Sequence, residues 1–215
     1  GMSLMECVKR LRGPKGTEVI ITIIREGFTQ MQDITIVRDI INIQSVKFKT
    51  LEEGYGHLRI LQFQTSTADD ARKALKALRQ ENPDGLSGLI LDLRNNPGGL
   101  LDQAVALSDL FLDQGVIVTI KGRDAEERTA FSAHQEGTIP PWPIVILVNQ
   151  GSASASEIVA GALQDYGRAV IMGSKTFGKG SVQTIIPLDD GSGIKLTTAR
   201  YFTPNNRSIH EHGVE

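Results

Sequence analysis

The pattern of apolar and polar residues predicts strands that alternate with helices through the middle of the chain. Two short apolar runs, GLILDL at 88–93 and IVILV at 144–148, are typical of buried strands. A segment with helical spacing follows each run, and the second of these helices ends at Gly167. The first presents four apolar residues on one face, Leu100, Ala104, Leu107 and Phe111. This alternation predicts an α/β core with a largely parallel central sheet.

The same pattern predicts further elements before and after these segments, and a strand at 116–120 between them that belongs to the same alternation. Ser3 and Glu6 form a capping box, S-x-x-E, before a first helix that Gly13 closes. A second amphipathic helix begins at 67–70 and presents Ala71, Ala74, Leu75 and Leu78. Strands are expected at 19–24, 32–38, 57–63, 116–120, 169–172, 182–187 and 194–201. A short connector is expected before the strand at 57–63.

Composition excludes several classes of protein. The 215 residues are 40% hydrophobic and 22% charged, which is typical of one medium-sized globular domain, alone or with a fragment of another. The net charge is −2, so no basic surplus indicates a nucleic acid partner. No apolar run approaches the roughly 20 residues that span a bilayer. Cys7 is the single cysteine, which excludes a disulfide framework and a cysteine-based metal site.

The segment NQGSASASEI, residues 149–158, places three serines at alternating positions between the apolar run and its helix. A serine at a strand-to-helix turn exposes its hydroxyl at the edge of the sheet. The N-terminus of the helix also favours negative charge that develops there. Ser154 and Glu157 form S-x-x-E as well, so an N-cap role for Ser154 remains open.

Two glycine-rich segments accompany the serines. In RNNPGG, residues 94–99, paired glycines allow a close backbone approach, as half of an oxyanion hole requires, although a tight turn explains them too. GSKTFGKGSVQ, residues 173–183, nearly matches a phosphate-binding loop. Gly180 stands where a magnesium-binding hydroxyl belongs, and a strand-like run follows, so we exclude nucleotide binding. Lys179 and Gln183 share a face if the segment is extended; an exposed surface lysine is the alternative.

The four histidines are His57, His134, His210 and His212, and none is close to the serine segment in sequence. Their spacing is not that of a zinc site. The pair in IHEHG is open to two interpretations, a metal contact or a solvated turn. A lysine can replace histidine as a base only as a neutral amine, which burial beside the sheet would favour.

Together these segments resemble the carboxy-terminal processing (tail-specific) protease family, serine peptidases with a Ser–Lys dyad. The resemblance rests on LDLRNNPGGL, VNQGSASASEIVAGAL, GSKTFGKGSVQ and the closing GSGIKLTTARYFTP and IHEHGV. It implies Ser154 as nucleophile, Lys179 as base and Gln183 as the residue that positions the lysine. It also implies an oxyanion hole made by the N–H groups of Gly99 and Ala155, a crotonase-like α/β core, and no cofactor or metal.

The opening GMSLMECVKRLRGPKGTEVIITIIREG resembles the last helix and strand of the PDZ domain that these proteases carry. We therefore expect a truncated PDZ remnant at 1–27 and a C-terminally truncated protease core at 28–215. The resemblance implies a fragment of a longer exported protein, periplasmic or membrane-associated on the extracytoplasmic side.

The expected function is that of a serine endopeptidase that cleaves proteins near their C-termini. Its expected partners are protein or peptide substrates with exposed apolar C-terminal tails, and no nucleic acid. The oligomeric state is open, a homo-oligomer included.

Three alternatives remain. The first is a non-catalytic peptide- or ligand-binding relative of the same fold. The second is a crotonase-type acyl-CoA enzyme, and the third is a Ser–His–Asp hydrolase that uses His57 or His134. The acyl-CoA enzyme would need acidic catalytic residues and an adenine site, which no motif marks.

Overall fold

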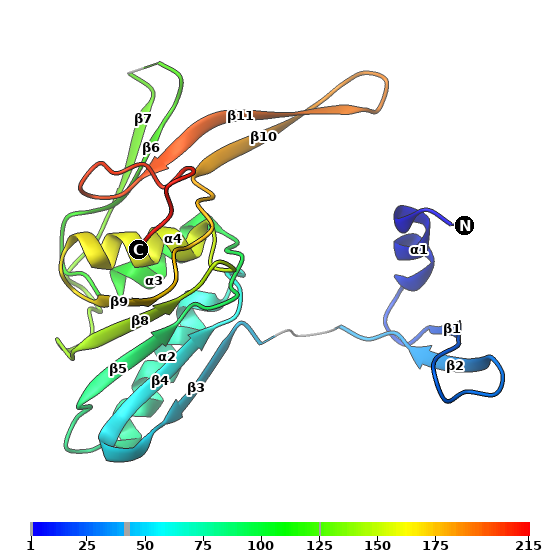
Figure 1. Ribbon diagram of the computed structural model, residues 1–215, viewed down its shortest axis with the longest axis horizontal. Helices are drawn as coiled ribbons and strands as arrows, with labels where there is room; N and C mark the ends of the chain where they lie inside the picture. Colours follow the sequence, from blue (N-terminus) through cyan, green and yellow to red (C-terminus); the bar gives the residue numbers. More distant parts are fainter. Residues whose placement is uncertain (1, 41–43, 125) are drawn as a thin grey trace. The chain divides into compact units, whose positions relative to one another are not determined.

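The computed structural model describes residues 2–40, 44–124 and 126–215, and the chain divides into two compact units, Gly1–Ile43 and Gln44–Glu215 (Figure 1). Strands β1 and β2, which lie on either side of residue 27, pair with each other and belong to the smaller unit. The expected PDZ remnant at 1–27 and protease core at 28–215 stay predictions.

The smaller unit contains one helix and a two-stranded antiparallel sheet: α1 (Leu4–Leu11), β1 (Glu18–Ile23) and β2 (Gln32–Val37). The Ser3 hydroxyl accepts a hydrogen bond from the Glu6 N–H at 3.3 Å, so the predicted cap is present. The helix ends at Leu11, where the Arg38 guanidinium donates to the Leu11 carbonyl oxygen at 2.8 Å. That bond satisfies one of the carbonyl groups that a helix end leaves free.

A five-stranded sheet forms the core of the larger unit (Figure 1). In spatial order its strands are β3 (Val46–Thr50), β4 (Tyr55–Ile60), β5 (Gly88–Asp92), β8 (Ile144–Val148) and β9 (Val170–Gly173). β4, β5, β8 and β9 run parallel, and β3 pairs antiparallel with β4. The predicted α/β core with a largely parallel sheet is therefore confirmed.

Strand β3 occupies part of the segment expected to be a connector. Its sequence, VKFKT, carries two lysines among five residues and lies at the edge of the sheet. Charged side chains are common on edge strands, and they weaken the apolar pattern by which a strand is predicted. A short 3₁₀ turn, η1 (Glu52–Gly54), joins β3 to β4. The pairing with β4, more than the local sequence, makes this segment a strand.

Three helices pack together beside this sheet: α2 (Thr67–Glu81), α3 (Leu101–Asp109) and α4 (Ala155–Asp165). The predicted apolar face of α2 is buried, namely Ala71, Ala74, Leu75 and Leu78. Every residue from Ala155 to Leu163 is buried, because α4 contacts both β9 and strand β6 of a second sheet. None of the helices in the described ranges combines the length and apolar content that crossing a lipid bilayer requires.

The second sheet is antiparallel and was not predicted. Its spatial order is β10 (Ser181–Pro187), β11 (Gly193–Phe202), β6 (Val116–Lys121) and β7 (Arg128–Ser132). The sequence pattern predicted β6 as part of the parallel core and gave no signal for β7. In the structure Lys121 pairs with Arg200 and Thr119 with Phe202. No local pattern reveals such a long-range pairing. Figure 1 shows the β10–β11 hairpin extending away from the helices.

The carboxyl ends of the parallel strands meet at one edge of the five-stranded sheet. β5 ends at Asp92, β8 at Val148 and β9 at Gly173. RNNPGG, the serine segment and the lysine segment follow these ends directly. In sheets of this kind, reactive groups gather at the carboxyl edge.

Candidate active site

The three alternating serines have different environments. Ser152 and Ser156 are buried, whereas Ser154 is only partly covered. The Ser152 hydroxyl donates to the carbonyl oxygen of Leu93 at 2.8 Å, and the Ser156 hydroxyl donates to that of Asn96 at 3.0 Å. The two outer serines therefore anchor the loop after β5, at Leu93 and within RNNPGG, and the middle one is left for another role.

Ser154 has a strained backbone at the start of α4. Its φ of 56° and ψ of −115° lie in a region of backbone conformation that residues other than glycine rarely adopt. Holding a residue there costs about 1–3 kcal/mol of folding free energy. The predicted capping box with Glu157 is present, and the Ser154 N–H donates to Glu157 Oε2 at 2.8 Å. An ordinary N-cap residue has an extended backbone, so capping alone does not explain this conformation. Retained strain of this kind is concentrated at functional sites.

The paired glycines bring their loop against Ser154. A Cβ atom on Gly98, whose φ is 96°, would lie 2.7 Å from the Ser154 Cβ and 2.9 Å from the Ala155 nitrogen. A Cβ atom on Gly99, whose φ is 146°, would lie 2.1 Å from the carbonyl oxygen of Phe63. Only glycine fits at either position. Within the described ranges the N–H groups of Gly99 and Ala155 donate no hydrogen bond, so both are available beside the serine.

Asn96 holds the loop in this conformation, although the sequence predicted no role for it. Its side chain is fully buried, donates to the Ile60 carbonyl oxygen at 2.9 Å and accepts from the Gly98 N–H at 2.9 Å. The backbone carbonyl oxygen of Asn96 accepts from the Ala153 N–H at 3.0 Å. Asn96 thus connects β4, the glycines and the serine segment. The only signal in the sequence was its place within RNNPGG.

Asp92 and Arg94 anchor the base of the same loop. The Asp92 carboxylate is fully buried and receives two bonds from the Arg94 side chain, at 2.9 and 2.7 Å, and one from the Arg94 N–H at 3.0 Å. Burial by itself raises the pKa of Asp92. The Arg94 hydrogen bonds and the charges of Arg94 and Arg59 outweigh burial, so the pKa is lowered below its ordinary value of 3.8.

The lysine segment is tied to the serine segment through Glu157. Its Oε1 accepts from the Thr176 hydroxyl at 2.5 Å and from the Gly178 N–H at 2.6 Å. Its Oε2 accepts from the Lys179 N–H at 2.8 Å as well as from Ser154. The only role that the sequence predicted for Glu157 was that of a partner in the helix cap.

The side chains of Lys179 and Gln183 differ from expectation in two respects. Both are exposed, so the residues described here do not bury the lysine amine. Lys179 also lies before β10, which begins at Ser181, so strand alternation does not place it on a face with Gln183. In the described part of the chain, neither the Lys179 amine nor the Gln183 amide makes a hydrogen bond. The dyad and its positioning glutamine therefore stay predictions.

The closing IHEHGV segment packs on the lysine segment. The Glu211 N–H donates to the Gly178 carbonyl oxygen at 2.9 Å. A Cβ atom on Gly180 would lie 2.2 Å from the backbone nitrogen of His210. The structure thereby brings His210 next to Gly180, with its Nδ1 atom buried and without a hydrogen-bond partner among the described residues. The two histidines of the alternative Ser–His–Asp site lie elsewhere. His57 Nε2 is 3.4 Å from Asp92 Oδ2, and His134 Nδ1 is 3.5 Å from Asp109 Oδ2.

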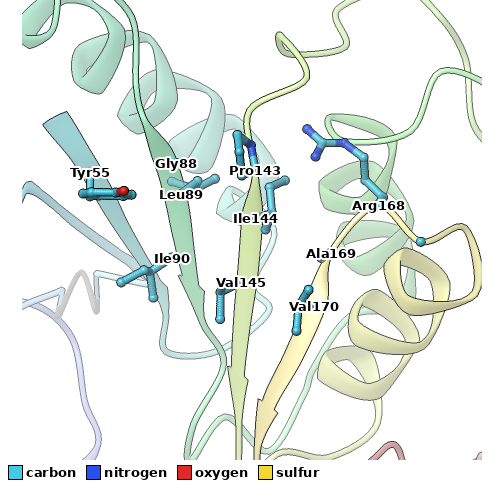
Figure 2. A pocket seen from close by; sticks show the side chains of 11 residues that line it. Tyr55, Gly88, Leu89, Ile90, Pro143, Ile144, Val145, Arg168, Ala169 and Val170 are labelled. Carbon is cyan, nitrogen blue, oxygen red and sulfur yellow. The ribbon is translucent and has the colours of Figure 1, made fainter.

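An apolar cavity of about 440 Å³ lies at the opposite end of the parallel strands. Figure 2 shows Tyr55, Leu89, Ile144 and Val170 around it, at the beginnings of β4, β5, β8 and β9. Its one cationic side chain, Arg168, is engaged by the carbonyl oxygens of Phe111 and Trp142 at 3.1 and 2.7 Å. The cavity therefore plays no part in chemistry at the carboxyl edge of the sheet, where Ser154 lies.

We predict that Asp92→Asn lowers the free energy of unfolding at pH 7 by about 2 kcal/mol, because charge-assisted hydrogen bonds to Arg94 are lost. The pKa of Asp92 is lower in the folded chain, so its stabilisation is present above the ordinary value of 3.8 and is lost as pH falls through the lowered one. Urea unfolding at several pH values should therefore show the difference between wild type and variant shrinking below pH 3.8. A constant difference would contradict this assignment.

Residues 54–215 match the model of peptidase family S41. The carboxy-terminal-processing protease of Bartonella bacilliformis is 49% identical over 215 residues, which cover 100% of this chain and 49% of that protein. The carboxyl-terminal-processing protease of Synechocystis sp. is 41% identical over 217 residues, covering 99% and 50%. This chain thus spans about half the length of these relatives.

Solved structures agree with these matches. The photosystem II D1 C-terminal processing protease superposes with a TM-score of 0.72 and 34% identity, over 100% of this chain and 58% of that one. Mature CPAF complexed with lactacystin, at 14% identity, a TM-score of 0.63 and coverage of 95% and 63%, shares the fold. The family match includes the serine, glycine and lysine segments described above. The protein therefore belongs to peptidase family S41.

Proposed function

We propose that this protein is a serine endopeptidase that cleaves proteins near their C-termini. One observation carries the proposal: a strained Ser154 immediately precedes α4 and lies against the loop that carries Gly99, and the N–H groups of Gly99 and Ala155 make no hydrogen bond in the described ranges. An oxyanion hole requires two such donors beside a nucleophile. The helix N-terminus adds to the stabilisation of negative charge.

The proposed reaction proceeds through an acyl-enzyme. The Ser154 Oγ attacks the carbonyl carbon of the scissile bond, and its proton passes to the neutral amine of Lys179. The N–H groups of Gly99 and Ala155 hold the oxyanion. The proton then passes to the leaving amine, and water hydrolyses the ester. Each half-reaction uses only these residues, the substrate and water.

Lys179 must be neutral to accept the proton, yet its side chain is exposed in the free chain. A peptide bound across Ser154 would cover the amine and remove water from it, which disfavours the charged form. In this proposal Gln183 orients the amine once the substrate is bound. The base is thus completed by substrate binding.

The proposed substrates are proteins with exposed apolar C-terminal tails. The names of the relatives support processing at carboxyl termini. An apolar tail also fits the expected PDZ remnant at 1–27, since PDZ domains bind an extended peptide at the edge of a sheet.

The first test concerns the nucleophile. Ser154→Ala should abolish cleavage of a model protein with an apolar C-terminal tail, and also covalent labelling by a fluorophosphonate probe. Mass spectrometry of the labelled wild type should locate the probe on Ser154.

Ser152→Ala and Ser156→Ala are the matched controls. Each loses one buried hydrogen bond, worth about 1 kcal/mol of stability, and should keep part of the activity. Wild-type turnover by Ser154→Ala would show that Ser154 is only a cap.

A second test concerns the base. Lys179→Arg should be as inactive as Lys179→Ala in the cleavage assay, since a guanidinium stays charged and cannot accept the proton. His210→Ala should retain cleavage. If Lys179→Arg is active and His210→Ala is inactive, the base is the histidine that packs beside Gly180.

A third test concerns the loop that carries Gly99. Gly98→Ala places a Cβ atom 2.7 Å from that of Ser154 and should lower kcat at least about 100-fold, because the oxyanion donors are displaced. Gly137→Ala is the control: its φ is also positive and its Cβ would meet no atom within 4 Å, so the strain is similar without the contact. Comparable loss of kcat in both variants would contradict the predicted role of the loop.

A further inference from the structure

Glu157 is a buried carboxylate with an unusual set of partners. Its side chain is fully buried, and each of its oxygens accepts from two donors. An ionised carboxylate has about four acceptor positions, so all are filled. No lysine, arginine or histidine in the described ranges forms an ion pair with it. These four donors surround the carboxylate, which lies in the first turn of α4.

One oxygen of this carboxylate joins the two segments of the proposed dyad. The N–H groups of Ser154 and Lys179 both donate to Oε2, each at 2.8 Å. The two backbone nitrogens are therefore at most 5.6 Å apart, twice that distance. No other side chain in the described ranges receives hydrogen bonds from both residues.

The second oxygen extends this connection to the closing segment. The Thr176 hydroxyl donates to Oε1 and accepts from the Val214 N–H at 2.8 Å. The Gly178 N–H donates to the same oxygen. The lysine segment is thus held from both sides, by Glu157 and by the residues that follow β11.

We infer that Glu157 is a positioning residue, which sets the separation and orientation of Ser154 and Lys179 for catalysis. This inference rests on the proposed function. Glu157 is too buried to touch a substrate, so it acts through the two backbones that it binds. A misplacement of about 1 Å between reacting groups lowers the rate about 100-fold.

Glu157→Gln tests the inference with almost no change in volume. A glutamine has one acceptor oxygen, and its NH₂ group would face two of the four donors. The segments should separate, so kcat should fall about 100-fold while KM stays within about threefold. Fluorophosphonate labelling of Ser154 should slow by a similar factor. Glu157→Asp, which keeps the charge on a shorter side chain, should recover part of kcat.

Leu163→Ala is the control for general destabilisation. Leu163 is fully buried near the far end of α4, and its truncation should lower the thermal unfolding midpoint, with kcat unchanged at a temperature where the protein is folded. Circular dichroism and thermal unfolding would be followed for every variant. If Glu157→Gln does not fold, Glu157→Asp alone decides, with kcat between wild type and inactive as the supporting result.

Two outcomes would overturn the inference while leaving the proposed function intact. One is wild-type kcat in Glu157→Gln or in Glu157→Asp with normal labelling of Ser154. The other is a loss of kcat in Leu163→Ala that matches the loss in Glu157→Gln. If the wild type neither cleaves nor is labelled at Ser154, the proposed function itself fails, and the inference fails with it.

Discussion

Four hydrogen bonds to one buried carboxylate hold the candidate site together. Glu157 lies on α4, and its donors come from the serine turn and from the loop after β9. A buried carboxylate with unfilled acceptor positions is costly, so all four donors must reach it at once. The requirement couples the start of α4 to a segment more than 20 residues later, and the arrangement of both elements depends on it.

The serine segment uses one residue type for two purposes. Ser152 and Ser156 are buried and donate to carbonyl oxygens of the neighbouring loop, which binds that loop to the turn. Ser154, between them, has a strained backbone and remains accessible in part. Rigid anchors on both sides make the strain tolerable, because the surrounding contacts over-determine the conformation. Gly98 completes the contact, since any side chain there would collide with Ser154.

The second sheet supplies the outer support. β6 pairs with β11, and the residues after β11 return to the lysine segment, where Val214 binds Thr176. The closing IHEHGV motif thus holds the Lys179 loop in place through hydrogen bonds to Thr176 and Gly178. It also brings a histidine next to the lysine loop, although no histidine is close to the serine segment in sequence.

The sequence by itself determined the parallel core, the turns at its carboxyl edge and the residue types gathered there. Short apolar runs and helical spacing are local signals, and the carboxyl ends of parallel strands share an edge whatever the details of packing. The glycines of RNNPGG and the alternation of the serines are local too, so both segments were identifiable, whereas the choice of Gly99 and Ser154 within them rested on the resemblance to the protease family. Only the tertiary structure decided that β6 joins an antiparallel sheet, that VKFKT pairs as an edge strand, and that Lys179 stays exposed. It alone assigned Glu157 and Asn96 their contacts. These features depend on pairing and burial between residues far apart in the chain, and such contacts leave no periodic signal in the sequence around either partner.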